Sequence, residues 1–196
     1  MLRYAAVLIL ALSASASAED VVEPRSGVSF PATRDGLDLI GTGLRLKSIA
    51  FVKVKVYALA LYVAPSARDG VLAQHRGKNR PPALYQDLMW GDFPKEIVLR
   101  FTRGLGQGRI QEAMREALEG ADKARTDAFI SYFPEVQEGQ ECVLRWVSPG
   151  GSLDVTMAGE KKPRIDDKAF AAAVFGIWLR ETPIQDDIKA ELVSRL

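Results

Sequence analysis

The residues best suited to bind a ligand lie in the stretch from Gly41 to Val63. Arg45 carries a guanidinium, whose paired N–H groups match the two oxygens of a carboxylate. Lys53, Lys55 and Tyr57 add cationic and phenolic donors a few residues later. Three aliphatic side chains follow on the same face, namely Leu59, Leu61 and Val63. A surface that is polar at one end and apolar at the other can hold a carboxylate with an apolar tail.

A long strand has to present these side chains. Residues 52–63 are rich in Val, Tyr and Leu, which is typical of a pleated and largely buried strand. Because side chains alternate along a strand, we expect Lys53, Lys55 and Tyr57 to share one face. The same alternation fits a plain central strand whose polar end emerges into water, because long charged side chains commonly cover apolar surface there.

Two segments resemble a known family. GTGLRLK at 41–47, followed by FVKVKVYALALYV at 51–63, resembles the core signature of the chalcone isomerase-like superfamily in its bacterial, exported branch. The ending AAAVFGIWLRETPIQDDIKAELVSRL at 171–196 resembles the C-terminal pair of helices of that superfamily. The resemblance extends from about Val28 to the end of the chain and rests on the order and spacing of segments.

For catalysis, the resemblance gives a mixed result. In true chalcone isomerases an arginine after a Gly-rich turn and a threonine on the next strand flank the reacting groups, and a Tyr–Lys–Asn group follows on a later helix. Arg45 matches the arginine, whereas the place of the threonine falls on Tyr57. The later group falls on Arg109, Glu112 and Glu116. Two carboxylates facing a phenolate would repel the charge that the isomerase must stabilise, so flavonoid cyclisation is not expected.

The fatty-acid-binding members of the superfamily resemble this sequence better. They pair the same arginine with a tyrosine on the strand, and the resemblance therefore implies that Arg45 and Tyr57 hold a fatty-acid carboxylate. The tail is expected in a cleft between sheet and helices, lined by Leu59, Leu61, Phe101, Met114, Phe175 and Trp178. The expected function is non-catalytic binding of a fatty acid or small amphipathic carboxylate, with no cofactor and no catalytic residue.

Two other functions remain open. One is an intramolecular lyase or isomerase acting on a ketone or phenol, in which Arg45 polarises an oxygen and Tyr57 donates a proton. The other is an interaction module that uses the basic loop at 75–80, HRGKNR. In that loop His75, the only histidine, has no Ser, Cys or carboxylate near it in sequence, so we expect a solvated residue rather than a general base.

Metal and nucleotide sites are not indicated. One histidine, one acidic pair at a helix start and one within the last helix make poor ligand sets for a metal. Cys142 is the only cysteine and lies in the strand-like run CVLRWV, so it is expected to be a small buried hydrophobe. The turn from Gly104 to Gly108 does not continue into a dinucleotide fingerprint.

Length, charge and the first residues place the chain in a broad class. The 196 residues suffice for one domain, and 26 basic against 25 acidic side chains give no indication of nucleic-acid binding. Residues 1–18 combine Arg3, an apolar run and the small residues Ala16-Ser17-Ala18. This is typical of a signal peptide cleaved near Ala18, with a periplasmic or secreted domain at 19–196 and no transmembrane segment. The oligomeric state is left open.

Periodicity elsewhere predicts the fold class. Strands are expected near 28–30, 37–40, 95–103, 141–147 and 152–157, the last two joined by a hairpin turn at 148–151. Helices are expected after Pro81, at 109–119 and at 122–133, then from Asp166 and from Pro183. We therefore predict an α+β domain: a mainly antiparallel sheet covered on one face by helices, an open-faced β-sandwich of the chalcone isomerase-like kind.

Overall fold

The computed structural model describes residues 19–196. The predicted signal peptide, residues 1–18, and its cleavage point lie outside the described residues. The described chain contains nine strands: β1 Val21–Val22, β2 Ser29–Phe30, β3 Thr33–Arg34, β4 Leu37–Ile49, β5 Val52–Val63, β6 Lys95–Phe101, β7 Glu141–Val147, β8 Ser152–Met157 and β9 Glu160–Lys161.

Strands β3 to β9 form one seven-stranded sheet in which the spatial order follows the chain order. Every neighbouring pair is antiparallel. β1 and β2 form a separate two-stranded ribbon. The predicted antiparallel sheet and the 148–151 hairpin between β7 and β8 are thus confirmed, whereas β1, β3 and β9 are too short to leave a pattern in the sequence.

The helices lie in the connections and at the end of the chain. They are α1 Pro65–Asp69, the 3₁₀ helix η1 Ala73–His75, α2 Pro82–Trp90, α3 Gln107–Ala117, α4 Lys123–Ser131, α5 Lys168–Leu179 and α6 Asp186–Glu191. The carboxylates of Asp122 and Asp167 cap α4 and α5 by accepting from the backbone N–H groups of Arg125 and Phe170. The last helix is shorter than expected, because it begins at Asp186 rather than at Pro183.

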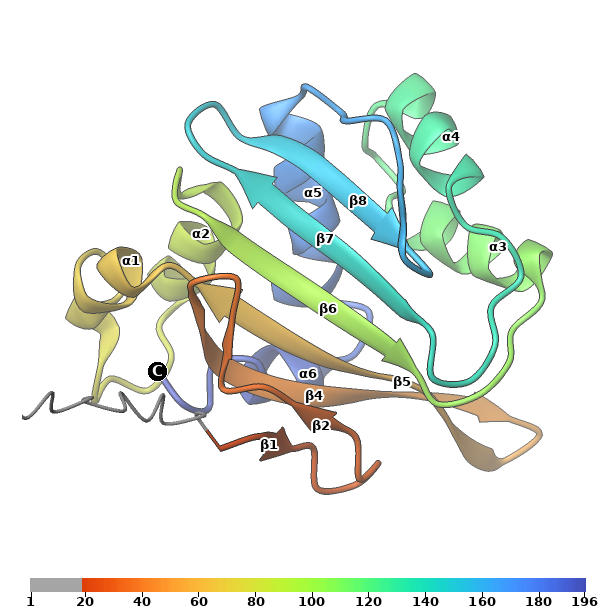
Figure 1. The fold of residues 1–196 in the computed structure, drawn as a ribbon, viewed down its shortest axis with the longest axis horizontal. Coiled ribbons are helices and arrows are strands. Elements are labelled where there is room, and N and C mark those ends of the chain that lie inside the picture. Colours follow the sequence, from red (N-terminus) through yellow and green to blue (C-terminus); the bar gives the residue numbers. More distant parts are fainter. Residues whose placement is uncertain (1–18) are drawn as a thin grey trace, which may run out of the picture.

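Helices cover one face of the sheet, as predicted, and Figure 1 shows α5 and α6 behind the strands. The centre of this face is apolar, since Leu59, Leu99 and Cys142 lie opposite one another across β5, β6 and β7. Against it α5 packs its aromatic side chains, with the Phe175 ring 6.2 Å from the Trp146 ring. Burial raises the pKa of the Cys142 thiol, so this cysteine is the inert core residue that we expected.

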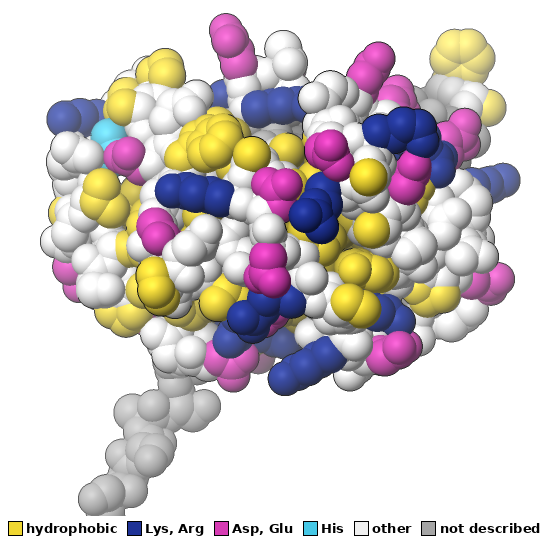
Figure 2. All heavy atoms as spheres, turned by 90° about the horizontal axis from the view of Figure 1, so that it is seen from above, with side chains coloured by type: hydrophobic (Ala, Val, Ile, Leu, Met, Phe, Trp, Pro, Cys, Tyr) yellow, Lys and Arg dark blue, Asp and Glu magenta, His cyan; other side chains and the backbone are white. Residues whose placement is uncertain are grey.

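The N-terminal segment covers part of the opposite face. The Tyr62 hydroxyl donates to the Pro31 carbonyl at 2.9 Å, and the Arg100 guanidinium donates to the Ser29 carbonyl at 2.9 Å. Phe30 is fully buried beneath the Arg100 guanidinium. On the face shown in Figure 2, acidic and basic side chains are interspersed around small apolar groups, without a large patch of one charge.

The two ends of the β4–β5 hairpin have different surroundings. At its base, α6 approaches so closely that a Cβ atom on Gly41 would lie 2.4 Å from the Glu191 carbonyl oxygen. At its other end the hairpin extends beyond the sheet (Figure 1), because β5 pairs with β6 only from Tyr57 onward. Residues 46–56, which we call the distal hairpin, therefore form a two-stranded ribbon that no other sheet strand flanks in the described chain.

Candidate functional site

Arg45 and Tyr57 are brought together by the pairing of β4 with β5. They are direct partners in the ladder, and the register shifts by one residue immediately beyond them, which leaves Val56 as a bulge. Leu46 therefore pairs with Lys55. Because Arg45 and Leu46 are consecutive, their side chains point to opposite faces, and so do those of Tyr57 and Lys55. The expectation that the lysines share the face of Tyr57 is wrong, since simple alternation cannot anticipate a bulge.

The Lys55 side chain confirms this geometry. Its ammonium donates to the Arg25 carbonyl at 2.5 Å, on the side of the N-terminal segment. Lys53 lies two ladder pairs from Lys55, so its side chain is on the same face as that of Lys55, and it is exposed. The cationic part of the candidate site is thus reduced to Arg45.

Tyr57 lies in the core beneath the helices. Its ring contacts two predicted lining residues edge-on, with centroids 6.0 Å from Phe101 and 6.5 Å from Trp178. The Trp178 indole N–H donates to the Tyr57 hydroxyl oxygen at 3.1 Å. Within the described chain, the hydroxyl proton itself is donated to no acceptor. Burial, the largest cause, raises the pKa of Tyr57 to about 12, although Trp178 and Arg45 favour the ionised form, so the phenol is a neutral donor at pH 7.

Arg45 is half-buried and has spare hydrogen-bonding capacity. Its Nη1 donates to the Leu46 carbonyl at 2.9 Å and to the Gln185 side-chain oxygen at 3.2 Å. Among the described residues, its Nε and Nη2 groups donate no hydrogen bond and its charge meets no carboxylate within ion-pair distance. An unpaired guanidinium beside a phenol with a free proton can bind an anion, and a carboxylate matches both groups.

Gln185 is the residue at this site that the sequence did not predict. Its side-chain oxygen accepts from the Leu46 backbone N–H at 2.9 Å, and its side-chain nitrogen donates to the Leu44 carbonyl at 3.2 Å. The amide thus satisfies backbone groups on either side of Arg45 and also contacts the guanidinium. No sequence signal indicates this role, because Gln185 lies in the loop before α6, 140 residues from Arg45.

The residues predicted to line the tail belong to the same core, and they are closely packed against one another and their neighbours. Leu59 and Leu61 follow Tyr57 on the helix-facing side of β5, and Phe101 lies opposite Tyr57 on β6. The Phe175 ring packs edge-on against Trp146. Each predicted lining side chain is buried: Leu59, Leu61, Phe101, Met114, Phe175 and Trp178. An acyl chain can enter only if the helices move away from the sheet.

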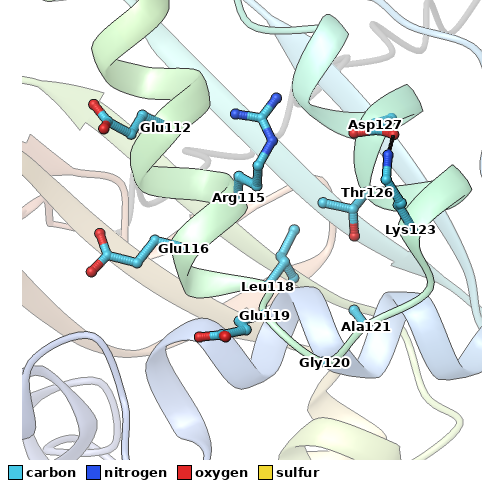
Figure 3. Close-up of a pocket in the computed structure, with 10 residues that line it drawn as sticks. All are labelled: Glu112, Arg115, Glu116, Leu118, Glu119, Gly120, Ala121, Lys123, Thr126 and Asp127. Carbon is cyan, nitrogen blue, oxygen red and sulfur yellow. Dashed lines mark hydrogen bonds and ion pairs between the residues drawn. The ribbon is translucent and has the colours of Figure 1, made fainter.

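The carboxylates expected on α3 lie elsewhere. Glu112 and Glu116 line a surface hollow of about 690 Å³ formed with the start of α4. Figure 3 shows both on one side of α3, whereas Arg115 extends from the other side towards Lys123 and Asp127. Lys123 and Asp127 pair with each other at 2.6 Å. Neither glutamate contacts Tyr57, so they give no support to an isomerase-like constellation.

The basic loop also differs from expectation. His75 is buried rather than solvated, and its Nε2 lies 2.7 Å from a carboxylate oxygen of Asp87 on α2. The loop that follows it, Arg76 to Arg80, lines a second hollow of about 410 Å³ together with the C-terminal residues. Neither hollow is lined by a predicted ligand-binding residue.

Residues 19–196 contain neither a metal-binding cluster nor a membrane-spanning helix. In that range no group of three or more His, Cys, Asp or Glu side chains is arranged to hold a metal ion. No helix there has the length and apolar character needed to span a bilayer.

The chain is similar to known proteins over most of its length. The sequence profile of the family described as chalcone isomerase-like matches residues 25–194. Chalcone isomerase-like protein 1 from Humulus lupulus is 28% identical over 191 residues, covering 88% of each chain. Fatty-acid-binding protein 1 from Arabidopsis thaliana is 24% identical over 198 residues, covering 90% of this chain and 70% of its own.

Two further similarities concern an enzyme and a structure. Chalcone–flavanone isomerase from Phaseolus vulgaris is 27% identical over 192 residues, covering 86% of each chain. The crystal structure of an Arabidopsis thaliana fatty-acid binding protein superposes with a TM-score of 0.73 at 24% identity, over 90% of this chain and 96% of that chain. The fold is therefore shared, and the profile match over nearly the whole chain shows that this protein belongs to the chalcone isomerase-like family.

Proposed function

We propose that this protein binds a fatty acid or another small amphipathic carboxylate without transforming it. Arg45 and Tyr57 hold the carboxylate, and the tail lies between the sheet and the helices. The observation that carries the proposal is the pairing of an arginine that lacks a carboxylate partner with a buried phenol whose proton has no acceptor within the described chain.

The energetics of such a complex are sufficient for useful affinity. Charge-assisted hydrogen bonds from Arg45 and Tyr57 contribute about 1.5–3 kcal/mol each. Burial of the tail adds about 0.8 kcal/mol per methylene group. Part of this gain offsets the cost of separating α5 from the sheet, because Trp178 and its neighbours are closely packed. Fatty-acid-binding protein 1 of Arabidopsis thaliana, whose name gives its ligand, supports the same ligand class.

The state of Tyr57 argues against catalysis. A general acid works best with a pKa near the working pH, whereas burial holds the pKa of Tyr57 at about 12. Such a phenol donates a hydrogen bond well but transfers its proton poorly. An intramolecular lyase, suggested by the similarity to chalcone–flavanone isomerase, is therefore the second candidate.

Binding is tested by titrating the purified protein with saturated fatty acids of increasing length and with their methyl esters. The acids should bind and the esters should bind far more weakly, because an ester lacks the charge that Arg45 recognises. Arg45→Ala and Tyr57→Phe should each weaken binding about tenfold or more. Two controls should bind like the wild type: Arg195→Ala, an exposed arginine, and Tyr62→Phe, a buried tyrosine on the opposite face.

Native mass spectrometry of the protein purified from its own cells gives an independent test. A co-purified carboxylate that is lost in Arg45→Ala supports the proposal and identifies the ligand class. Unchanged ligand uptake by Arg45→Ala would contradict both functions assigned to this site. Steady turnover of a chalcone by the pure protein would establish the lyase instead. A protein without ligand and without turnover would favour an interaction module that uses the loop at 75–80.

We also propose that residues 1–18 are a signal peptide and that the protein acts in the periplasm or outside the cell. Arg3, the apolar run after it and the small residues ending at Ala18 support this assignment. Mass measurement of the protein recovered from the periplasmic or culture fraction should give a chain beginning near Glu19. An uncleaved chain found only in the cytosol would refute it.

A further inference from the structure

The tip of the distal hairpin exposes an aromatic side chain. Phe51 is fully exposed and Val52 is 64% exposed, the two largest exposures among the large hydrophobic residues described. They lie at the turn between β4 and β5, where the ribbon is flanked by no other sheet strand of the described chain. A lone exposed apolar residue is ordinary, but here two such residues are consecutive and lie at the end of a projecting ribbon.

The turn itself is unusual for its sequence. Ala50 has a φ of 45° and Phe51 a φ of 69°, the left-handed region expected for a two-residue hairpin turn of type I′. Such turns strongly favour Asn-Gly, since residues with larger side chains are strained there. A phenylalanine in this position gains no packing contact in return, because its side chain is fully exposed. Backbone strain that is not offset by packing within the protein is found at sites that bind a ligand or a partner.

The charge around the tip is of one sign. Between Asp38 and Asp69 the sequence contains no acidic residue, and the whole β4–β5 hairpin carries four basic residues: Arg45, Lys47, Lys53 and Lys55. Lys47 and Lys53 are exposed, and among the described residues neither forms an ion pair. They belong to consecutive pairs of the ladder, Lys47 with Val54 and Lys53 with Ser48, so they project from opposite faces of the ribbon.

The spacing fits the surface of a membrane. At about 3.4 Å per residue, both of these ladder pairs lie within roughly 10 Å of the turn. This matches the depth to which interfacial segments insert their apolar side chains, about 5–10 Å, with cations at the level of the headgroups. A convex tip with lysines on both faces suits a flat anionic surface better than a protein groove, which would have to enclose the ribbon.

We infer that the distal hairpin docks on anionic lipid membranes, with Phe51 and Val52 inserted at the interface and Lys47 and Lys53 contacting the headgroups. Docking would bring the end of the hairpin that carries Arg45 towards the bilayer. Membrane docking does not depend on fatty-acid binding at Arg45 and Tyr57, and each is tested by its own variants.

The test is co-sedimentation with vesicles of phosphatidylcholine, with and without about one-third phosphatidylglycerol. The protein should bind the anionic vesicles and lose binding as the salt is raised from about 0.1 to 0.5 M. Phe51→Ala, and separately the double variant Lys47→Gln with Lys53→Gln, should each weaken binding by about tenfold or more. Because all three residues are exposed, these variants should unfold at the wild-type temperature.

Matched control variants distinguish specific binding by the hairpin from non-specific adsorption to the vesicles. Trp90 is also an exposed aromatic residue, at 47%, but lies at the end of α2 near Asp87 and Asp92. Trp90→Ala and the double variant Lys123→Gln with Lys161→Gln should leave vesicle binding unchanged. Phe51→Trp should bind like the wild type, and its added fluorescence should be quenched by brominated lipids.

Three results would overturn membrane docking by the hairpin. The first is a wild-type protein that does not sediment with anionic vesicles. The second is a Phe51→Ala variant that binds as well as the wild type. The third is a concentration-dependent dimer in light scattering that Phe51→Ala abolishes while vesicles have no effect, which would assign the tip to contact with a second copy of this chain.

Discussion

The Trp178 indole donates a hydrogen bond to the Tyr57 hydroxyl across the interface between α5 and the sheet, at 3.1 Å. Both groups are buried, so loss of either partner leaves a polar atom without compensation. We predict that Tyr57→Phe lowers the free energy of unfolding by about 1–3 kcal/mol, because the indole N–H loses its acceptor. Denaturant titration followed by tryptophan fluorescence measures this change.

A double-mutant cycle isolates that hydrogen bond from packing changes. Tyr57→Phe and Trp178→Phe together should cost less than the sum of the two single changes, with a coupling of about 1 kcal/mol. Tyr62→Phe with Trp178→Phe should be additive, because Tyr62 bonds to Pro31 on the opposite face of the sheet. Additivity in the first cycle would show that the indole and the phenol do not interact in solution.

Gln185 should control the order of the strand at Arg45. Replacement by Leu removes the acceptor of the Leu46 N–H and the donor to the Leu44 carbonyl. We expect the Leu46 amide to exchange with solvent at least about tenfold faster, and carboxylate affinity to fall because Arg45 loses its support. Gln111→Leu, which removes a side-chain bond to the Phe133 carbonyl on the helical layer, is the control. Equal exchange at Leu46 in both variants would argue against the assigned role.

Gly41 and Gly43, both within β4, should differ sharply in their tolerance of a methyl group. A Cβ on Gly41 would lie 2.4 Å from backbone atoms of Glu191 and Leu192, whereas at Gly43 the nearest atom is a side-chain oxygen of Glu191 at 3.1 Å. The backbone atoms near Gly41 cannot move away from an added methyl group as easily as the Glu191 side chain can near Gly43. Gly41→Ala should therefore destabilise the protein by about 3 kcal/mol or more, through separation of α6 from β4.

Thermal unfolding of two companion variants provides the comparison. Gly43→Ala should cost about 1 kcal/mol or less, because the Glu191 carboxylate can move. Gly106→Ala should be neutral, since nothing lies within 4 Å of the added atom and φ is negative there. If Gly41→Ala melts together with Gly106→Ala, α6 does not pack closely on Gly41.

Lys95 should make stability depend on pH above neutrality. Its ammonium is fully buried, donates to the Gly91 carbonyl and lies 3.7 Å from the centre of the Trp146 ring. Burial lowers the pKa of Lys95 from 10.5 to about 7. Between these values the unfolded chain binds more protons than the folded one, so stability increases as the pH rises.

From pH 7 to about pH 8.5 we expect the free energy of unfolding to rise by about 1.5 kcal/mol. This window lies below the ordinary pKa values of cysteine and tyrosine, 9.0 and 10.0, so Cys142 and Tyr57 contribute little to it. Lys95→Met should abolish the slope. Lys161→Met, at an exposed position, should retain it, and a slope that survives in Lys95→Met would assign the titration to another group.

Much of the fold could be predicted because its long elements follow simple periods. β7 and β8 bury alternate residues, β5 is buried from Tyr57 onward, and α3 places Ile110 and Met114 on its buried side. The short strands β1, β3 and β9 have two residues each, and a two-residue strand has no period to detect. The burial of His75 escaped prediction because its partner Asp87 comes from the next helix.

The candidate site could be predicted only in part. The resemblance to the family gave Arg45 and Tyr57, and the structure makes them ladder partners. The bulge at Val56 reversed the expected face of Lys53 and Lys55, because alternation assumes an unbroken ladder. Gln185 remained hidden because its role depends on contacts between segments far apart in the chain, which no local spacing encodes.

The order of strands in the sheet also bears on when the site is completed. From β3 to β9 each strand pairs with the one synthesised before it, so most of the sheet can assemble while translation continues. Trp178 and Gln185, which contact Tyr57 and Arg45, come from the last part of the chain to emerge. A ribosome-bound chain that has exposed only its strands therefore lacks the contacts of Trp178 and Gln185 with Tyr57 and Arg45, and the proposed carboxylate site is complete only after both have emerged.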